Sequence, residues 1–267
     1  MIDWTDAFDN SSYVPGSDKL GAHWADQALT YRKTLGNRAQ MHIRYGQHDR
    51  EVYDLFTPET QPQGTLIFVH GGYWHLFDKS YWSHLAKGPM AHGWAVAMPS
   101  YPLAPDARIA DITQSITRAV THIASHTMGP LRLAGHSAGG HLVSRMLCPD
   151  TLDPATRDRI EKVTSISGLH DLLPLTHALI NDTLNLTEDE AIAESAARHD
   201  SAQHIAATFW VGAAERPEFL RQTRLIAERW SAHNPHIKDV YEPGHHHFSV
   251  INGLIDPQSP LTQEVLT

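Results

Sequence analysis

Residues 131–147 read LRLAGHSAGGHLVSRML, and this stretch decides the fold. It opens with a short apolar segment typical of a buried strand and ends with a sequence typical of a helix. Between them lies GHSAG at 135–139, a G-x-S-x-G pattern in the strand-to-helix context that a nucleophile elbow requires. Such a turn lifts the serine oxygen above the sheet, beside the unpaired amides of a helix N-terminus. Ser137 is therefore the candidate nucleophile.

Strand-like and helix-like segments alternate on both sides of this turn. The alternation predicts an α/β fold with a mostly parallel central sheet and helices on both faces. The clearest helix is expected over 106–126, where apolar residues recur at spacings of three and four. Strands are expected at 50–56, 65–70, 94–98, 131–134, 163–167, 208–211 and 238–241, and further helices at 141–147 and 217–230.

We expect a single domain over residues 1–267, because no repeat or long linker divides the chain. Residues 1–40 have the composition of a helical N-terminal arm. Residues 171–200 are helical in composition and interrupt the alternation, which predicts a small cap over one end of the sheet.

A second glycine-rich motif, HGGYW at 70–74, follows the expected strand TLIFV. Glycines there allow the chain to pass close to a substrate carbonyl with its amides turned inward, so the motif predicts an oxyanion hole. The candidate donors are the backbone amides of Gly72, Tyr73 and Ala138. His70 is expected to hold this loop by hydrogen bonds. The alternative is a plain turn that ends the strand.

A serine nucleophile needs a general base, and in chains with this elbow the order is serine, acid, histidine. The sequence KDVYEPGHHHFSV places three histidines in a loop after the last expected strand. His247 is the candidate base, and His245 and His246 are the alternatives. A metal site is not expected here, because consecutive loop residues seldom point at one ion and no H-E-x-x-H spacing occurs.

The acid is expected in a loop at the end of the preceding strand. Glu215 lies four residues past Val211, the last residue of that expected strand, and is the first candidate. Asp171, which follows the strand before it, is the alternative. In either case the carboxylate would orient the imidazole and stabilise the imidazolium.

Together these motifs resemble the kynurenine formamidase (arylformamidase) family of α/β-hydrolases, which is related to the hormone-sensitive-lipase-like esterases. The resemblance implies the α/β-hydrolase fold and hydrolysis of N-formyl-L-kynurenine to L-kynurenine and formate. It also implies Ser137 as nucleophile and His247 as base, with Glu215 at a position where the family usually has aspartate. The stretches that carry it are HGGYW at 70–74, GHSAGGHL at 135–142, SGLHDLLPL at 167–175, LNLTEDEA at 184–191, PEFLRQT at 217–223 and HFSVI at 247–251.

Such a substrate would need an aromatic wall and a partner for its carboxylate. Ordinary core packing is the competing interpretation for Trp82 and Tyr101. The aromatic candidates are Tyr73, Trp74, Trp82 and Tyr101. The cationic candidates are His75, Lys79 and Arg108.

Composition restricts the kinds of partner that the chain could bind and the cell compartment in which it would work. The chain has 21 Lys and Arg against 30 Asp and Glu, a net charge of −9, which argues against a nucleic-acid phosphate site. Its single cysteine, Cys148, allows no disulfide within the chain and is expected to be a packed core residue. The start of the chain has no secretory pattern and no apolar run reaches membrane length, so we expect a cytoplasmic protein. We expect no cofactor and a small aromatic formamide or ester as substrate, with a homodimer left open.

Two other functions fit parts of this pattern. A general carboxylesterase acting on small acyl or aryl esters would use the same residues with a different leaving group. A catalytically silent binding module of the same fold would usually lack one member of the triad, whereas candidates for all three are present here. Most of the 20 histidines are expected at the solvated surface.

Overall fold

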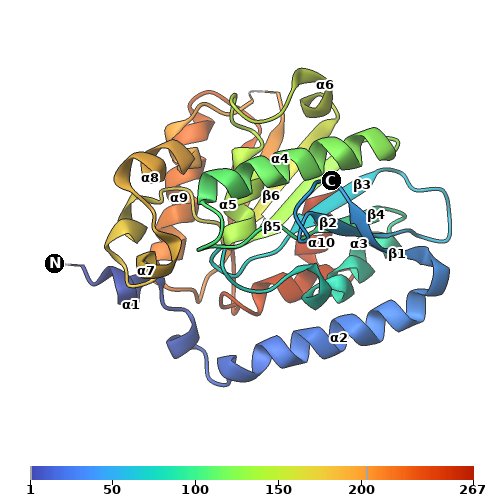
Figure 1. Cartoon of the computed structure of the whole chain (residues 1–267), viewed down its shortest axis with the longest axis horizontal. Coiled ribbons are helices and arrows are strands. Elements are labelled where there is room, and N and C mark those ends of the chain that lie inside the picture. Colours follow the sequence, from blue (N-terminus) through green and yellow to red (C-terminus); the bar gives the residue numbers. More distant parts are fainter. Residues whose placement is uncertain (1, 203) are drawn as a thin grey trace.

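A computed structural model describes residues 2–202 and 204–267 of the chain. One sheet has the strand order β1-β2-β4-β3-β5-β6-β7-β8. Strand β2 runs antiparallel to both of its neighbours, β1 and β4, and the remaining neighbouring strands are parallel to one another. This is the α/β-hydrolase fold expected from the sequence (Figure 1). The strands are β1 (Ala39–Arg44), β2 (Val52–Phe56), β3 (Thr65–Val69), β4 (Ala95–Pro99), β5 (Leu131–His136), β6 (Ile160–Ile166), β7 (Ala206–Gly212) and β8 (Ile237–Glu242).

Helices cover both faces of the sheet (Figure 1). The apolar sides of α4, α5 and α9 share one hydrophobic cluster with one sheet face, and those of α2, α3 and α10 share a second cluster with the other. The helices are α1 (Trp4–Phe8), α2 (Leu20–Leu35), α3 (Lys87–Ala91), α4 (Ile109–His126), α5 (Ala138–Arg145), α6 (Pro154–Arg157), α7 (Asn181–Leu184), α8 (Glu188–Glu194), α9 (Pro217–Ser231) and α10 (Pro260–Leu266).

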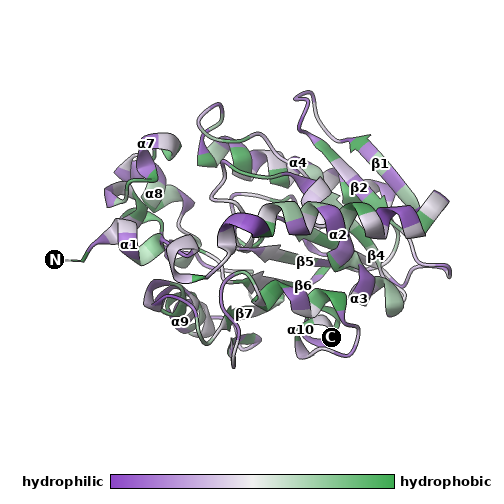
Figure 2. Cartoon of the chain, turned by 90° about the horizontal axis from the view of Figure 1, so that it is seen from below, coloured by the Kyte–Doolittle hydropathy of each residue, from purple (hydrophilic) through white to green (hydrophobic). Residues whose placement is uncertain are grey.

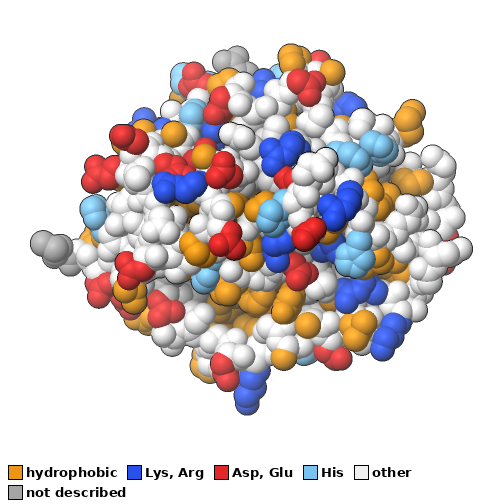
Figure 3. Space-filling model, in the orientation of Figure 1, with side chains coloured by type: hydrophobic (Ala, Val, Ile, Leu, Met, Phe, Trp, Pro, Cys, Tyr) orange, Lys and Arg blue, Asp and Glu red, His pale blue; other side chains and the backbone are white. Residues whose placement is uncertain are grey.

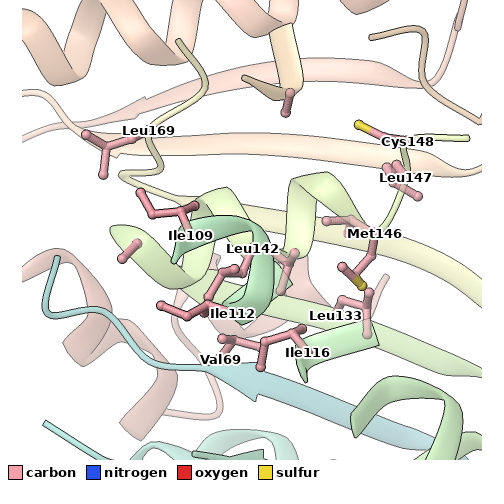
Figure 4. Close-up of a cluster of buried hydrophobic side chains, with 14 of the residues drawn as sticks. Val69, Ile109, Ile112, Ile116, Leu133, Leu142, Met146, Leu147, Cys148 and Leu169 are labelled. Atoms are coloured by element: carbon pink, nitrogen blue, oxygen red, sulfur yellow. The ribbon is translucent and has the colours of Figure 1, made fainter. Parts of the chain in front are cut away.

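Hydrophobic residues concentrate on the strands, whereas outer helices such as α2 alternate hydrophilic and hydrophobic residues (Figure 2). The stripe expected on α4 is buried along its length. Figure 4 shows Ile109, Ile112 and Ile116 of that stripe beside residues of α5 and β5. Cys148 lies in the same cluster, fully buried, and burial raises the pKa of its thiol to about 12. It is a packed core residue, as expected.

Three boundaries differ from the sequence-based expectations. The N-terminal region is not helical to residue 40, because Ala39–Arg44 forms the edge strand β1; its alternation of half-buried and exposed residues gives only a weak apolar signal. Helix α5 begins at Ala138 instead of His141, because Ser137 itself ends the strand and starts the helix. Residues 171–200 contain only the short helices α7 and α8 and 3-10 turns, which lie beside α1 (Figure 1).

Close backbone approach fixes the turn between β5 and α5. A Cβ on Gly135 would lie 2.1 Å from the carbonyl oxygen of Gly139, and one on Gly139 would lie 2.0 Å from the carbonyl oxygen of Val69. Only glycine fits at such distances. The helix therefore packs directly against the backbone of β3 and β5, and this contact determines where Ser137 lies.

We predict that Gly135→Ala lowers the free energy of unfolding by about 3 kcal/mol, the upper range of the cost of overpacking. The control is Gly21→Ala in α2, where a Cβ would meet only Phe77 Cε1 at 3.6 Å, and where alanine should be neutral or stabilising. Urea denaturation of both variants gives the comparison. Equal stabilities would contradict the close contact at the elbow.

Several histidines are buried, and burial keeps them neutral. Burial lowers the pKa of His70 and of His84 from 6.5 to about 4, and that of His141 to about 3. The unfolded chain therefore binds protons between about pH 6.5 and pH 4 that the folded chain does not bind. Acid consequently favours the unfolded state in this range.

We predict that the free energy of unfolding falls as the pH decreases below 6.5, by about 1 kcal/mol per pH unit for each of these rings. His84 offers a clean test, because neither of its ring nitrogens has a hydrogen-bond partner among the described residues. His84→Leu should reduce the slope of the free energy of unfolding against pH by the contribution of one ring, about 1 kcal/mol per pH unit. Urea midpoints at pH 7.5, 6.5 and 5.5 measure it, and identical slopes for the two proteins would contradict the prediction.

Candidate active site

Ser137 lies at the junction of β5 and α5. Its backbone has φ 55° and ψ −117°, a left-handed conformation that a serine adopts only when the surrounding structure imposes it. The Ser137 amide donates to the carbonyl oxygen of Ile166 on β6, at 2.8 Å, and its own carbonyl accepts from the His141 amide in α5. The serine is almost completely buried, yet it lines the cavity described below.

His247 and Glu215 come together from loops that follow β8 and β7. The distance from His247 Nδ1 to Glu215 Oε2 is 2.7 Å. A carboxylate oxygen accepts, so Nδ1 is the donor in this contact. His247 lines the same cavity as Ser137. The arrangement therefore offers a base whose orientation is set by an acid.

Glu215 is itself tightly held. Its second oxygen, Oε1, accepts from the amide of Gly212 at 2.8 Å and from the hydroxyl of Ser167 at 2.5 Å. Ser167 stands at the end of β6 with φ 52°. Each oxygen of this buried carboxylate thus has a partner, which offsets the cost of removing its charge from water.

The alternative residues have other partners. The Asp171 carboxylate lies 3.2 Å from the Arg221 guanidinium and 3.9 Å from that of Arg198. His245 faces Glu242 at 3.8 Å, and His246 Nδ1 accepts from the Phe248 amide. None of the three has a hydrogen bond to the Glu215–His247 pair among the described residues.

His136, the variable residue of the G-x-S-x-G pattern, has a part that sequence reasoning missed. Its Nε2 donates to the carbonyl oxygen of His247 at 2.8 Å, and the two rings lie 4.7 Å apart. Burial lowers the pKa of His136 well below 6.5, so its ring is neutral. His136 therefore ties the elbow to the backbone of the candidate base; only its place in the motif could have signalled this.

The HGGYW loop runs directly over the elbow. A Cβ on Gly71 would come within 3.0 Å of the Ser137 Cβ. Gly72, Tyr73 and Trp74 have φ values of 110°, 47° and 58°, so three successive residues are left-handed. Among residues 2–202 and 204–267, the amides of Gly72 and Tyr73 donate no hydrogen bond, and Ala138 supplies the first amide of α5. The loop and the helix thus present free donors close to Ser137.

Buried side chains support this loop. His70 Nδ1 is 2.7 Å from the Gly71 carbonyl oxygen, and the ring of Tyr101 stacks on that of His70 at 4.4 Å. The Tyr101 hydroxyl donates to the His70 carbonyl, and Trp74 Nε1 donates to His141 Nδ1 at 3.3 Å. His70 therefore holds the loop, as expected, and its low pKa keeps it out of proton transfer.

The expected aromatic wall is wrong in two of its four members. Trp74 and Tyr101 are fully buried behind the loop and do not line the cavity, because their polar atoms are directed to His141 and His70. Tyr73 and Trp82 do line it.

The three cationic candidates are not in the lining either. Lys79 is buried in a 2.7 Å ion pair with Asp54, Arg108 is paired with Glu190, and His75 is half-buried outside the lining of the cavity.

The cavity has a volume of about 490 Å³ and lies between the HGGYW loop, the elbow, the N-terminal segment and residues 178–183. Its walls are mainly apolar and aromatic. Sequence reasoning missed the N-terminal contribution, which comprises Thr5, Phe8, Asp9, Asn10, Ser11, Ser17, Gly21 and Trp24. Within the described residues, no group of three or more His, Cys, Asp and Glu side chains could hold a metal ion.

On the face drawn in Figure 3, basic and acidic side chains are interspersed and do not gather into a basic patch. In the described part of the chain, no helix combines the length and the apolar character needed to cross a membrane.

Comparison with known proteins shows which proteins this chain resembles. The kynurenine formamidase of Danio rerio is 29% identical over 96% of this chain and 91% of its own length, and that of Salmo salar is 29% identical over 85% and 80%. A crystal structure from Silicibacter sp. TM1040, described as a candidate thioesterase, is 45% identical over the full length of both chains with a TM-score of 0.96. An esterase of Pyrobaculum calidifontis shares the fold, with a TM-score of 0.72 at 15% identity over 93% of this chain and 92% of its own.

These relatives are hydrolases, and this chain is a hydrolase of the same fold. The BD-FAE family matches residues 53–224, about two-thirds of the sequence. The chain belongs to the BD-FAE family of esterase-like α/β-hydrolases.

Proposed function

We propose that this enzyme is a serine hydrolase that cleaves the N-formyl amide of N-formyl-L-kynurenine, giving L-kynurenine and formate. The observation that carries the proposal is the 2.7 Å contact between Glu215 and His247, with His247 and Ser137 lining one cavity beneath a glycine-rich loop. The similarity to kynurenine formamidases over nearly the whole chain supports the choice of substrate.

In the proposed reaction, His247 Nε2 removes the proton from the Ser137 hydroxyl as its oxygen attacks the formyl carbon. Glu215 holds the ring in the required tautomer and stabilises the imidazolium that forms. The developing oxyanion accepts from the amides of Ala138 and of Gly72 or Tyr73. Collapse of the tetrahedral intermediate breaks the C–N bond, and the imidazolium protonates the departing arylamine.

The formyl ester left on Ser137 is then hydrolysed. His247 takes a proton from water as the oxygen attacks the ester carbon, the C–O bond to Ser137 breaks as the proton passes to the serine oxygen, and the formic acid released ionises to formate and a proton in solvent. Because the acyl group is a single carbon, most of the cavity is free for the aromatic leaving group. Apolar residues such as Trp82, Phe77 and Phe248 supply the walls for its ring.

One relative favours a second candidate, hydrolysis of small esters or thioesters. The Silicibacter protein described as a candidate thioesterase is 45% identical along the whole chain. The same nucleophile, base and donors serve that reaction, so only the leaving group differs. The two functions are therefore separated by substrate preference and not by residues of the elbow.

We predict that the purified enzyme hydrolyses N-formyl-L-kynurenine with kcat/KM above about 10⁴ M⁻¹s⁻¹, in the ordinary enzyme range, and more efficiently than p-nitrophenyl acetate. Ser137→Ala should lower kcat by about 10³-fold or more, because the covalent step is lost. Ser144→Ala is the control, since that hydroxyl is buried in the same helix, bonds to the Gly140 carbonyl and does not line the cavity.

Efficient ester or thioester hydrolysis with negligible formamidase activity would favour the second candidate. Full activity of Ser137→Ala on every substrate would refute the mechanism itself.

We predict that Glu215→Gln lowers kcat by about 10³- to 10⁴-fold, because the amide keeps the size of the side chain but cannot stabilise the imidazolium. Asp171→Asn removes the other candidate acid and should leave kcat within about threefold, as its carboxylate contacts arginines instead of His247. Steady-state kinetics on the same substrate compare the two variants. A larger loss in Asp171→Asn than in Glu215→Gln would reverse the assignment.

A further inference from the structure

The turn between α1 and the 3-10 helix Ser11–Tyr13 presents a buried amide to the cavity. Asn10 is 6% exposed, and its Nδ2 has no hydrogen-bond partner among the described residues. Asn10 occupies the N-cap position of Ser11–Tyr13, yet its side chain makes no capping hydrogen bond. It lines the same cavity as Ser137. A buried donor without an acceptor is costly, so an acceptor on a bound ligand would relieve the cost.

The charge of the cavity favours a cation beside this amide. Asp9 precedes Asn10, lines the cavity as well, and has its pKa lowered by hydrogen bonds from Ser12. It is therefore ionised at neutral pH. No lysine or arginine belongs to the described lining, and the two histidines there are the neutral His136 and the candidate base His247. Asp9 is thus the only fixed charge that a ligand would meet on these walls.

The turn is held in place from two sides. The Tyr73 hydroxyl of the HGGYW loop donates to the carbonyl oxygen of Phe8 at 2.6 Å. The Arg216 guanidinium, next in sequence to Glu215, pairs with Asp6 and lies 3.6 Å above the centre of the Tyr13 ring. The polar groups of the turn are therefore positioned before a ligand arrives, which reduces the entropy lost on binding.

We propose that Asp9 and Asn10 form a subsite for the α-amino acid group of an aromatic substrate. The Asp9 carboxylate binds the primary ammonium, and Asn10 Nδ2 donates to a carboxylate or carbonyl oxygen next to it. The inference rests on the proposed function, because it names the part of that substrate that lies away from the scissile amide. It also explains how a cavity whose described lining has no lysine or arginine recognises an amino acid: its one fixed charge pairs with the ammonium, and a neutral amide binds the neighbouring oxygen.

The test uses two ligands that need no catalysis. L-Kynurenine has the amino acid group, whereas 2-aminoacetophenone keeps the aryl ketone and lacks that group. Asp9→Asn removes the charge but can still accept from the Ser12 amide, and Asn10→Leu removes the donor at similar size. Asp3→Asn is the matched control, because Asp3 caps α1 in the same segment but does not line the cavity.

We expect Asp9→Asn and Asn10→Leu each to weaken L-kynurenine binding about tenfold or more by calorimetry, the scale of a lost hydrogen bond to a charged group. Binding of 2-aminoacetophenone should be unchanged, which also shows that the cavity remains intact. Asp3→Asn should alter neither affinity.

Equal losses for both ligands, or no loss for L-kynurenine, would overturn the subsite. Absence of L-kynurenine binding to the unaltered protein would overturn it as well. Formylkynurenine hydrolysis is measured on the same preparations. Hydrolysis without Asp9-dependent binding would support the proposed function and overturn the subsite. Asp9-dependent binding without hydrolysis would support the subsite and overturn the proposed function.

Discussion

The close approach of α5 to the backbone of β3 and β5 is the constraint on which the site depends. Gly135 and Gly139 allow it, since a side chain at either position would overlap a carbonyl oxygen. The same compact turn forces Ser137 into its left-handed conformation and brings the first amide of α5 beside it. The HGGYW loop passes so near that Gly71 almost meets the Ser137 Cβ. The candidate nucleophile and the candidate oxyanion donors are therefore adjacent because three backbones touch.

Burial of the Glu215 carboxylate is a second constraint on the architecture. A carboxylate that is almost fully removed from water must have its charge compensated, and Glu215 finds its partners on three separate elements: Gly212 at the end of β7, Ser167 at the end of β6, and His247 after β8. These elements can supply them only where parallel strands end at one edge of the sheet. The extra methylene of glutamate is accommodated because Ser167 and Gly212 fix one oxygen while the other reaches the imidazole.

The parts of this site that could be predicted from sequence are those that a local pattern determines. The elbow, the HGGYW loop and the pairing of Glu215 with His247 as candidate acid and base follow from strand ends and from the order of residues along the chain. The place of Trp74 does not follow from the local pattern: its neighbours in sequence point to the cavity, whereas its left-handed backbone turns the indole toward His141. The contribution of the N-terminal segment depends on contacts such as that between Tyr73 and Phe8, 65 residues apart, which no periodicity encodes.

The family match and the N-terminal wall of the cavity come from different parts of the chain. The region that matches the family, residues 53–224, includes the elbow, the loop and Glu215, but neither the N-terminal wall of the cavity nor His247. Similarity to an esterase at 15% identity therefore describes the scaffold and leaves the N-terminal side of the cavity unspecified. That side is built by a short segment clamped to the scaffold through Tyr73 and Arg216. A change of one polar residue there can alter the charge that a ligand in the cavity meets without disturbing the backbone contacts on which the position of Ser137 depends.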